Sequence, residues 1–340
     1  MHYGNLKQLE EDLLAPSAAL IADIQRIQGD IMFLGIGGKM GPSMATLAVR
    51  AIRAAGIEKK VIGVSRFSDK NVEQSLNILG IETIACDLLD QGQLQKLPQI
   101  PNIIYLAGHK FGTTGNENFT WAMNTFLPGM VASHFKASNI VAFSSGNVLP
   151  FVPVTDGGIS EETTPEPIGE YAQSCLGRER IFEYFSKKNG TPTLIYRLNY
   201  AVDFRYGVLV EIAKAVKEQR PIDLTSQNVN VIWQGDANEI ALRSLLHCTS
   251  PAKILNVTGP EILSTRWIAE RFGELFNITP TFVNQAAETA LLNNASECHR
   301  LFGYPKTTIR EAIDITAKWL IEGGDLWNKD THFQERKGKF

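Results

Sequence analysis

A glycine-rich segment between residues 35 and 41 has the composition of a phosphate-binding loop. It joins an apolar strand-like run to an alanine-rich helical pattern, which is the context that phosphate binding requires. Gly35 permits a tight turn, Gly38 lets the backbone approach a pyrophosphate, and Gly41 lets the helix pack closely on the strand. The free N–H groups of the helix attract phosphate. The residues expected to contact a dinucleotide here are Gly35, Gly37, Gly38, Lys39, Met40 and Gly41.

The end of the second predicted strand indicates which dinucleotide is bound. Sites for NAD usually carry an acidic residue there, which accepts hydrogen bonds from the ribose hydroxyls. This chain has Ser65 and Arg66 instead. A carboxylate would repel a 2′-phosphate, whereas these residues and Lys39 would bind it. We therefore predict NADP as the preferred cofactor and NAD as the alternative. The other interpretation of Arg66 is a solvated charge at the strand end.

Short apolar runs alternate with helical patterns up to Asn199. The strands are expected at 31–35, 60–65, 82–86, 102–108, 139–145 and 191–199, and the main helices at 42–55, 116–136 and 166–188. Buried runs of this kind, separated by helices, are typical of parallel sheets with helices on both faces. The sequence therefore predicts an α/β fold with a Rossmann-type doubly wound parallel sheet.

Three parts of the chain are expected. Apolar residues at helical spacing (Leu6, Leu9 and Leu13, then Leu20, Ile24 and Ile27) indicate that residues 1–29 form an N-terminal helical extension over an edge or face of the main domain. Residues 30–199 would form the dinucleotide-binding Rossmann domain. Residues 200–340 would form a smaller, partly interleaved α/β lobe that binds the substrate. The elements expected in this lobe are helices at 206–219, 236–247, from 265 onward and at 308–321, and a strand at 229–233.

Several further motifs resemble the extended short-chain dehydrogenases/reductases, the nucleotide-sugar epimerase and dehydratase family. The glycines have that family's G-x-x-G-x-x-G spacing, and YLAG at 105–108 resembles its HLAA segment. FSSGNV at 143–148 resembles its F-x-S-S-x-x-V-Y-G strand end, and GEYAQSCLGRE at 169–179 resembles its Tyr-x-x-x-Lys helix. IYRLNYAV at 195–202 resembles the segment that leads into the substrate lobe. The resemblance covers the chain from roughly residue 30 to roughly residue 320.

The resemblance implies hydride exchange between a nicotinamide cofactor and a small polar, sugar-derived substrate. In this alignment Ser145 polarises the substrate oxygen and Tyr171 transfers its proton. The family also pairs through two long helices, here 116–136 and 166–188, so a homodimer is implied. The further cofactor contacts that the resemblance implies are Asp87 and Leu88 near adenine, Leu106, Ala107 and Gly108 beside the cofactor, and Asn124 in the following helix.

The chain departs from the family at Cys175, which stands in place of the lysine. That lysine holds the nicotinamide ribose, and its charge favours ionisation of the tyrosine. A phenol with a pKa of about 10 is a poor base near pH 7 without such help. Lys110 would supply a substitute charge, or it is a solvated loop lysine. Cys175 is either a small buried residue or a nucleophile.

Two other questions concern the same region. A literal Tyr-x-x-x-Lys occurs at Tyr184–Lys188, but it lies about 20 Å beyond Tyr171 at ~1.5 Å per residue, so we interpret Tyr184 as a packing residue. Arg197 and Trp233 either contact the ligand or belong to the core. The missing lysine also favours a second function, a non-catalytic NADP-binding protein that senses cofactor state or regulates a partner.

The composition of the chain excludes several classes of protein. The net charge of −3 indicates no nucleic-acid surface, and no apolar run approaches the ~20 residues that span a bilayer, so no membrane partner is expected. The acidic, amphipathic start does not resemble a signal peptide. The four cysteines (Cys86, Cys175, Cys248 and Cys298) lie far apart, which predicts free thiols in a reducing cytoplasm and no metal site.

Overall fold

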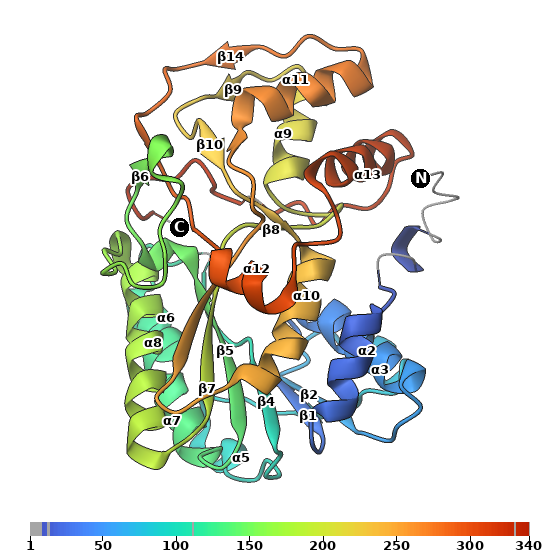
Figure 1. The fold of residues 1–340 in the computed structure, drawn as a ribbon, viewed down its shortest axis with the longest axis vertical. Helices are drawn as coiled ribbons and strands as arrows, with labels where there is room; N and C mark the ends of the chain where they lie inside the picture. Colours follow the sequence, from blue (N-terminus) through green and yellow to red (C-terminus); the bar gives the residue numbers. More distant parts are fainter. Residues whose placement is uncertain (1–8, 12–13, 111, 330, 340) are drawn as a thin grey trace.

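Seven parallel strands form the central sheet, in the order β12-β7-β5-β4-β1-β2-β3 (Figure 1). The computed structural model describes residues 9–11, 14–110, 112–329 and 331–339 of the chain. The strands are β1 (Ile31–Leu34), β2 (Val61–Ser65), β3 (Glu82–Ala85), β4 (Asn102–Tyr105), β5 (Asn139–Ser145), β7 (Thr193–Leu198) and β12 (Lys253–Val257). The predicted Rossmann-type, doubly wound α/β fold is confirmed.

Helices cover both faces of the sheet because successive strand residues point to opposite sides. Phe33 of β1 belongs to the apolar core on one face and Leu34 to the core on the other, and both are fully buried. The first face is covered by α2 (Ala18–Arg26), α3 (Gly41–Ala54), α4 (Lys70–Ile78), α10 (Gln234–Arg243) and α12 (Ser296–Phe302). The second is covered by α5 (Gln91–Leu94), α7 (Leu127–His134) and α8 (Gly169–Asn189).

The helical stretch expected at 116–136 contains a π-helical turn. It consists of α6 (Glu117–Trp121), the π-helix η1 (Ala122–Phe126) and α7. Such turns inside α-helices are frequent at functional sites. Asn124 lies in this turn and is fully buried. The turn therefore directs the asparagine toward the sheet rather than toward solvent.

A smaller lobe lies beyond the carboxyl edge of the sheet and has its own apolar core (Figure 1). Its helices are α9 (Val208–Lys217), α11 (Thr265–Phe276) and α13 (Ile309–Ile321), and its short strands are β8 (Ala201–Val202), β9 (Ile222–Asp223), β13 (Leu263–Ser264) and β14 (Phe282–Val283). A further pair, β6 (Val152–Pro153) and β15 (Thr289–Ala290), lies beside it. The helices expected in this part of the chain are present.

The prediction of a single strand at 229–233 is wrong. The segment forms two strands, β10 (Asn228–Val229) and β11 (Ile232–Trp233), which pair with β13 and β8. Asn230 separates them, because its buried side chain accepts a hydrogen bond from Asn199 and donates one to the Asn293 carbonyl.

The chain after Asn199 returns to the central sheet. Strand β12, which no sequence pattern predicted, pairs with β7 along its whole length. Helices α10 and α12 from the same half of the chain cover the sheet. The two halves are therefore interleaved, and the boundaries at 29 and 199 stay a prediction.

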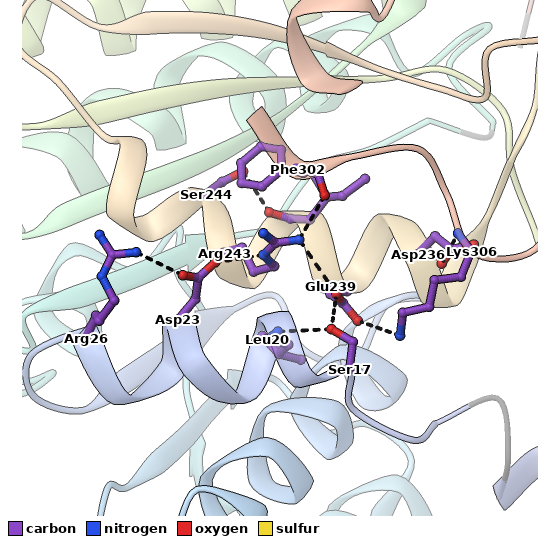
Figure 2. A network of polar contacts seen from close by, with 11 residues as sticks. Ser17, Leu20, Asp23, Arg26, Asp236, Glu239, Arg243, Ser244, Phe302 and Lys306 are labelled. Atoms are coloured by element: carbon purple, nitrogen blue, oxygen red, sulfur yellow. Dashed lines mark hydrogen bonds and ion pairs between the residues drawn. The ribbon is translucent and has the colours of Figure 1, made fainter. Parts of the chain in front are cut away.

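The N-terminal extension contacts both halves. Leu20 and Ile24 of α2 are buried in the sheet core, whereas Leu9 is buried in the core of the lobe. Leu6 and Leu13 lie outside the described residues. Figure 2 shows that α2 is also tied to α10 by polar contacts, in which Asp23 accepts from Arg243 at 2.7 Å.

The segment after α13, residues 322–329 and 331–339, crosses the lobe and ends beside α8; we call it the strap. Phe333 is buried in the lobe core, and Arg336 donates hydrogen bonds to Thr289. Gly338 packs against Gly169, where a Cβ would meet the Gly338 oxygen at 2.4 Å. The strap therefore joins the lobe to the first residue of α8.

Candidate active site

A cavity of about 530 Å³ lies between the carboxyl ends of the strands and the lobe. This edge of an open parallel sheet is where such folds bind ligands. The residues predicted from the sequence that line it are Gly35, Gly38, Lys39, Met40, Gly41, Leu106, Gly108, Lys110, Ser145 and Tyr171. Asn199, just after β7, also lines it, and the lobe and strap contribute Tyr200, Tyr206, Gly207, Lys329 and Thr331.

The glycine loop fits a diphosphate. Gly35 has a φ of +88°, and a Cβ there would lie 2.7 Å from the nitrogen of Ala107. A Cβ at Gly41 would lie 2.1 Å from the Ile36 oxygen, so both positions require glycine. Gly38 is exposed, and the nearest atom to a Cβ there would be 3.5 Å away. The loop therefore leaves open backbone at the start of α3, where N–H groups attract phosphate.

The predicted adenosine contacts lie outside the cavity lining, at the ends of β2 and β3. A Cβ at Gly37 would lie 2.8 Å from Ser65 Oγ, so the serine borders the loop directly. Arg66 follows it and is exposed. The carboxylate of Asp87 accepts a hydrogen bond from the Leu89 amide, and Leu88 and Ala107 are buried.

Ser145 and Tyr171 are brought together on one wall of the cavity. Ser145 ends β5 and donates a hydrogen bond to Asn147 at 2.9 Å. Tyr171 lies in the first turn of α8, and its hydroxyl interacts with the side chains of Ser145 and Cys175. Burial raises the pKa of Tyr171 well above its usual value, and the hydrogen bond with Ser145 opposes this only in part.

Cys175 is fully buried one turn further along α8. It packs with Val148, Leu149 and Ile159, and burial raises the pKa of its thiol. Such a thiol stays protonated near neutral pH and is a poor nucleophile. These surroundings favour the interpretation of Cys175 as a small buried residue.

Lys110 reaches the same wall from the loop after β4. Its ammonium group lies 5.8 Å from the centre of the Tyr171 ring. Burial lowers the pKa of Lys110 to about 8. The side chain therefore faces the tyrosine, as the substitute role requires.

Sequence reasoning missed Arg178. It lies two turns after Tyr171 on α8, is 7% exposed, and donates to Asn124 Oδ1 at 2.6 Å and to the Phe143 carbonyl at 2.8 Å. Asn124 in turn bonds both backbone groups of His109, so the two side chains hold the segment that leads to Lys110. The spacing of two turns from Tyr171 was the available signal, because it places the arginine on the same helix face.

Three other candidates are structural or exposed. Arg197 forms a fully buried ion pair with Glu179 at 2.7 Å, and Trp233 packs against Phe204 in the lobe core. Neither lines the cavity. Tyr184 is 54% exposed and contacts the neighbouring Phe185 edge to face, so it lies outside the core of the chain.

The described residues offer neither a metal site nor a membrane-spanning helix. No group of three or more histidine, cysteine or acidic side chains among them is placed to hold a metal ion. None of the helices they form is both long enough and apolar enough to cross a membrane.

The model of the NAD dependent epimerase/dehydratase family matches residues 35–240. This match spans more than half of the chain and contains the glycine loop, Ser145 and Tyr171. The chain belongs to the NAD-dependent epimerase/dehydratase family. No curated protein matches it.

Solved structures show the same fold at low identity. An epimerase from Methanothermobacter thermautotrophicus has a TM-score of 0.72 at 18% identity, covering 90% of this chain and 96% of its own. UDP-glucuronic acid 4-epimerase from Bacillus cereus, solved with a UDP-sugar and NAD, has a TM-score of 0.71 at 16% identity, covering 86% and 99%. UDP-glucose 4-epimerase from Thermus thermophilus, solved with NAD, has a TM-score of 0.68 at 17% identity, covering 85% and 98%.

Proposed function

We propose that this chain is an NAD(P)-dependent enzyme that exchanges hydride with a small sugar-derived substrate, most simply a nucleotide sugar. The observation that carries the proposal is the pairing of Ser145 with Tyr171 inside a cavity that also contains the glycine loop. The epimerases of Bacillus cereus and Thermus thermophilus, which share the fold, are described as acting on UDP-sugars. Their substrates support a nucleotide sugar as the class tested first.

The chemistry divides between the cofactor and the protein. When bound, the nicotinamide would supply reversible hydride exchange with a carbinol carbon of the substrate. Ser145 holds the substrate oxygen by a hydrogen bond, and Tyr171 takes the hydroxyl proton during oxidation and returns it during reduction. Hydride and proton leave together and come back together, so the cycle is balanced.

Lys110 supports this proton transfer in place of the family's lysine. Its positive charge beside the Tyr171 ring stabilises the tyrosinate form, because an opposite charge nearby lowers the pKa of a phenol. Arg178 adds a second buried positive charge that acts on Tyr171 in the same direction. Both residues would therefore offset the loss of charge at Cys175.

The proposal also includes a preferred cofactor, NADP, and an assembly, a homodimer. Ser65 and the exposed Arg66 at the end of β2 support NADP over NAD, because Arg66 can bind a 2′-phosphate.

Exposed aromatic side chains on η1 and α8 (Phe126 at 63% and Tyr184 at 54%) support a homodimer through these helices.

A second function remains in competition, a non-catalytic NADP-binding protein that senses cofactor state or regulates a partner. It is favoured by the raised pKa of Tyr171 beside a neutral Cys175. Single-turnover reduction of protein-bound NADP⁺ by a panel of nucleotide sugars separates the two. The enzyme predicts formation of the reduced nicotinamide and its loss in Tyr171→Phe. NADP⁺ binding without reduction by any sugar would favour the sensor.

A further inference from the structure

Three lysines from distant parts of the chain line the cavity together. Lys39 comes from the glycine loop, Lys110 from the loop after β4, and Lys329 from the strap. The ammonium group of Lys39 lies 3.2 Å from the centre of the Tyr206 ring, so it points toward the lobe. Three distant segments thus bring positive charge to one space.

The positive charges of Lys110 and Lys329 act on Lys39. Burial, which is the larger cause, and these two charges together lower the pKa of Lys39 to about 7. Gathering like charges in a partly enclosed cavity costs free energy that a bound polyanion can offset. The first turn of α3, with its positive dipole end, lies in the same cavity and adds to this attraction. The site therefore fits a ligand with several negative charges close together.

The strap holds Lys329 against the lobe. Just before it, the Trp327 amide donates to the Arg205 carbonyl at 3.2 Å, and the indole stacks on Tyr206 at 6.1 Å between centroids. Just after it, the Thr331 amide donates to Glu211 at 3.1 Å. These contacts on both sides of Lys329 limit its movement.

A second pocket of about 160 Å³ continues the cavity behind Lys329 and shares Tyr206 and Gly207 with it. Arg205, Lys214 and Arg220 line it. Glu211, which also lines it, accepts hydrogen bonds from the amide and hydroxyl of Thr331. Arg205 and Arg220 form ion pairs with Glu10 and Glu218, so Lys214 and Lys329 carry the basic character of this pocket.

We propose that Lys329 of the strap completes a diphosphate-binding site with Lys39 and Lys110. The inference rests on the proposed function only in its choice of ligands, because the dinucleotide and a nucleotide sugar both carry a diphosphate. The strap lies beyond the residues that the family model matches. Its lysine would make binding in this chain depend on a segment outside the matched region.

Calorimetric titration of Lys329→Gln tests the site. NADP⁺ is titrated into the free protein, and UDP is titrated into protein saturated with NADP⁺, with uridine as the ligand that lacks phosphate. We expect about tenfold weaker binding of one diphosphate ligand, since hydrogen bonds to charged groups are the stronger kind, and unchanged binding of uridine. Loss in the NADP⁺ titration assigns the lysine to the cofactor, and loss in the UDP titration assigns it to the substrate.

The matched control is Lys337→Gln, which removes the same charge from the same strap; both lysines are exposed, but only Lys329 lines the cavity. Lys329→Glu should weaken binding more than Lys329→Gln, and thermal unfolding should show that each variant is folded. Equal affinities of Lys329→Gln and the unmodified protein for both diphosphate ligands would overturn the proposal. Because the readout is binding, absence of hydride exchange would refute the proposed function and leave this result standing.

Discussion

The ammonium group of Lys110 lies 5.8 Å from the ring centre of Tyr171, on the wall of the cavity that also carries Ser145. In the family that the chain resembles, a lysine one turn after the tyrosine supplies this charge. Here that helix position is the buried Cys175, and the proposed substitute is the lysine of the loop after β4. In this proposal the electrostatic role is separated from the helix that carries the tyrosine.

Removing this charge should slow proton transfer. We expect Lys110→Gln to lower kcat at pH 7 by about 10²-fold at saturating ligands, since positioned acid–base groups contribute on this scale. Adding Cys175→Lys to Lys110→Gln should restore much of the loss, because the new lysine would stand at the family's position. Steady-state kinetics of both variants check this, and unchanged kcat in Lys110→Gln would contradict it.

Ligand binding should take up protons through Lys39. In the free protein the pKa of Lys39 is about 7, with Lys110, Lys329 and the Tyr206 ring around it. A bound diphosphate favours the charged form and so raises this pKa. Affinity should therefore fall as pH rises from 7 to 9. Calorimetry at pH 8 in two buffers of different ionisation enthalpy measures the uptake, and identical heats would refute it. Lys39→Gln should remove most of the effect.

Cofactor choice should depend on Arg66. We expect NADPH to bind at least tenfold more tightly than NADH, a difference of about 1.4 kcal/mol. Arg66→Asp should abolish or invert this preference, because a carboxylate repels the 2′-phosphate and accepts hydrogen bonds from a ribose hydroxyl. Lys96→Asp, at another exposed position, serves as the control. Equal affinities of the unmodified protein for the two cofactors would show the prediction to be wrong.

Assembly should depend on the apolar side chains of η1 and α8. Phe126 is 63% exposed, and Phe126→Glu should convert a dimer to a monomer in light scattering at micromolar concentration, because it places a charge in an apolar interface. Ile78 on α4 is 85% exposed on another helix, so Ile78→Glu should leave the dimer intact. A monomeric unmodified protein would rule out the proposed interface.

Two arginines that share Asp23 should differ in their effect on stability. Arg243 is 13% exposed and also contacts the Phe302 carbonyl and Glu239, whereas Arg26 is 69% exposed (Figure 2). Arg243→Met should lower the free energy of unfolding by about 1 kcal/mol, because the Phe302 carbonyl loses its charged donor and Asp23 and Glu239 lose one of their partners. Arg26→Met should cost less than about 0.5 kcal/mol. Denaturant unfolding of both measures the difference, and equal losses would contradict this account.

The glycine loop with its strand and helix, and the Ser145–Tyr171 pair, could be predicted because each residue belongs to a local motif. These motifs place the residues at the end of a strand or in the first turn of a helix. The ends of parallel strands meet at one edge of the sheet, which brings the residues together. Strand β12 could not be predicted in this way. It lies outside the alternation of strands and helices that ends at Asn199, and only its pairing with the distant β7 identifies it.

The same limit applies to side chains brought from other segments. Lys329 follows no motif, and it reaches the cavity because the strap folds back over the lobe. Asn230 interrupts an apolar run that reads as a single strand, and its role is visible only with Asn199 and Asn293 beside it. The places of Lys329 and Asn230 in the structure therefore depend on contacts between segments that are distant in the sequence.

The return of the chain to the sheet at β12 limits how the protein can be divided. A fragment that ended at Asn199 would retain β7 but lose the strand that covers its outer edge. Unpaired N–H and C=O groups would then line a strand rich in β-branched and aromatic residues, which is a template for aggregation. It would also lose α10 from one face of the sheet. The nucleotide-binding half is therefore expected to aggregate when it is expressed alone, and a soluble shortened protein would have to keep the chain through Val257.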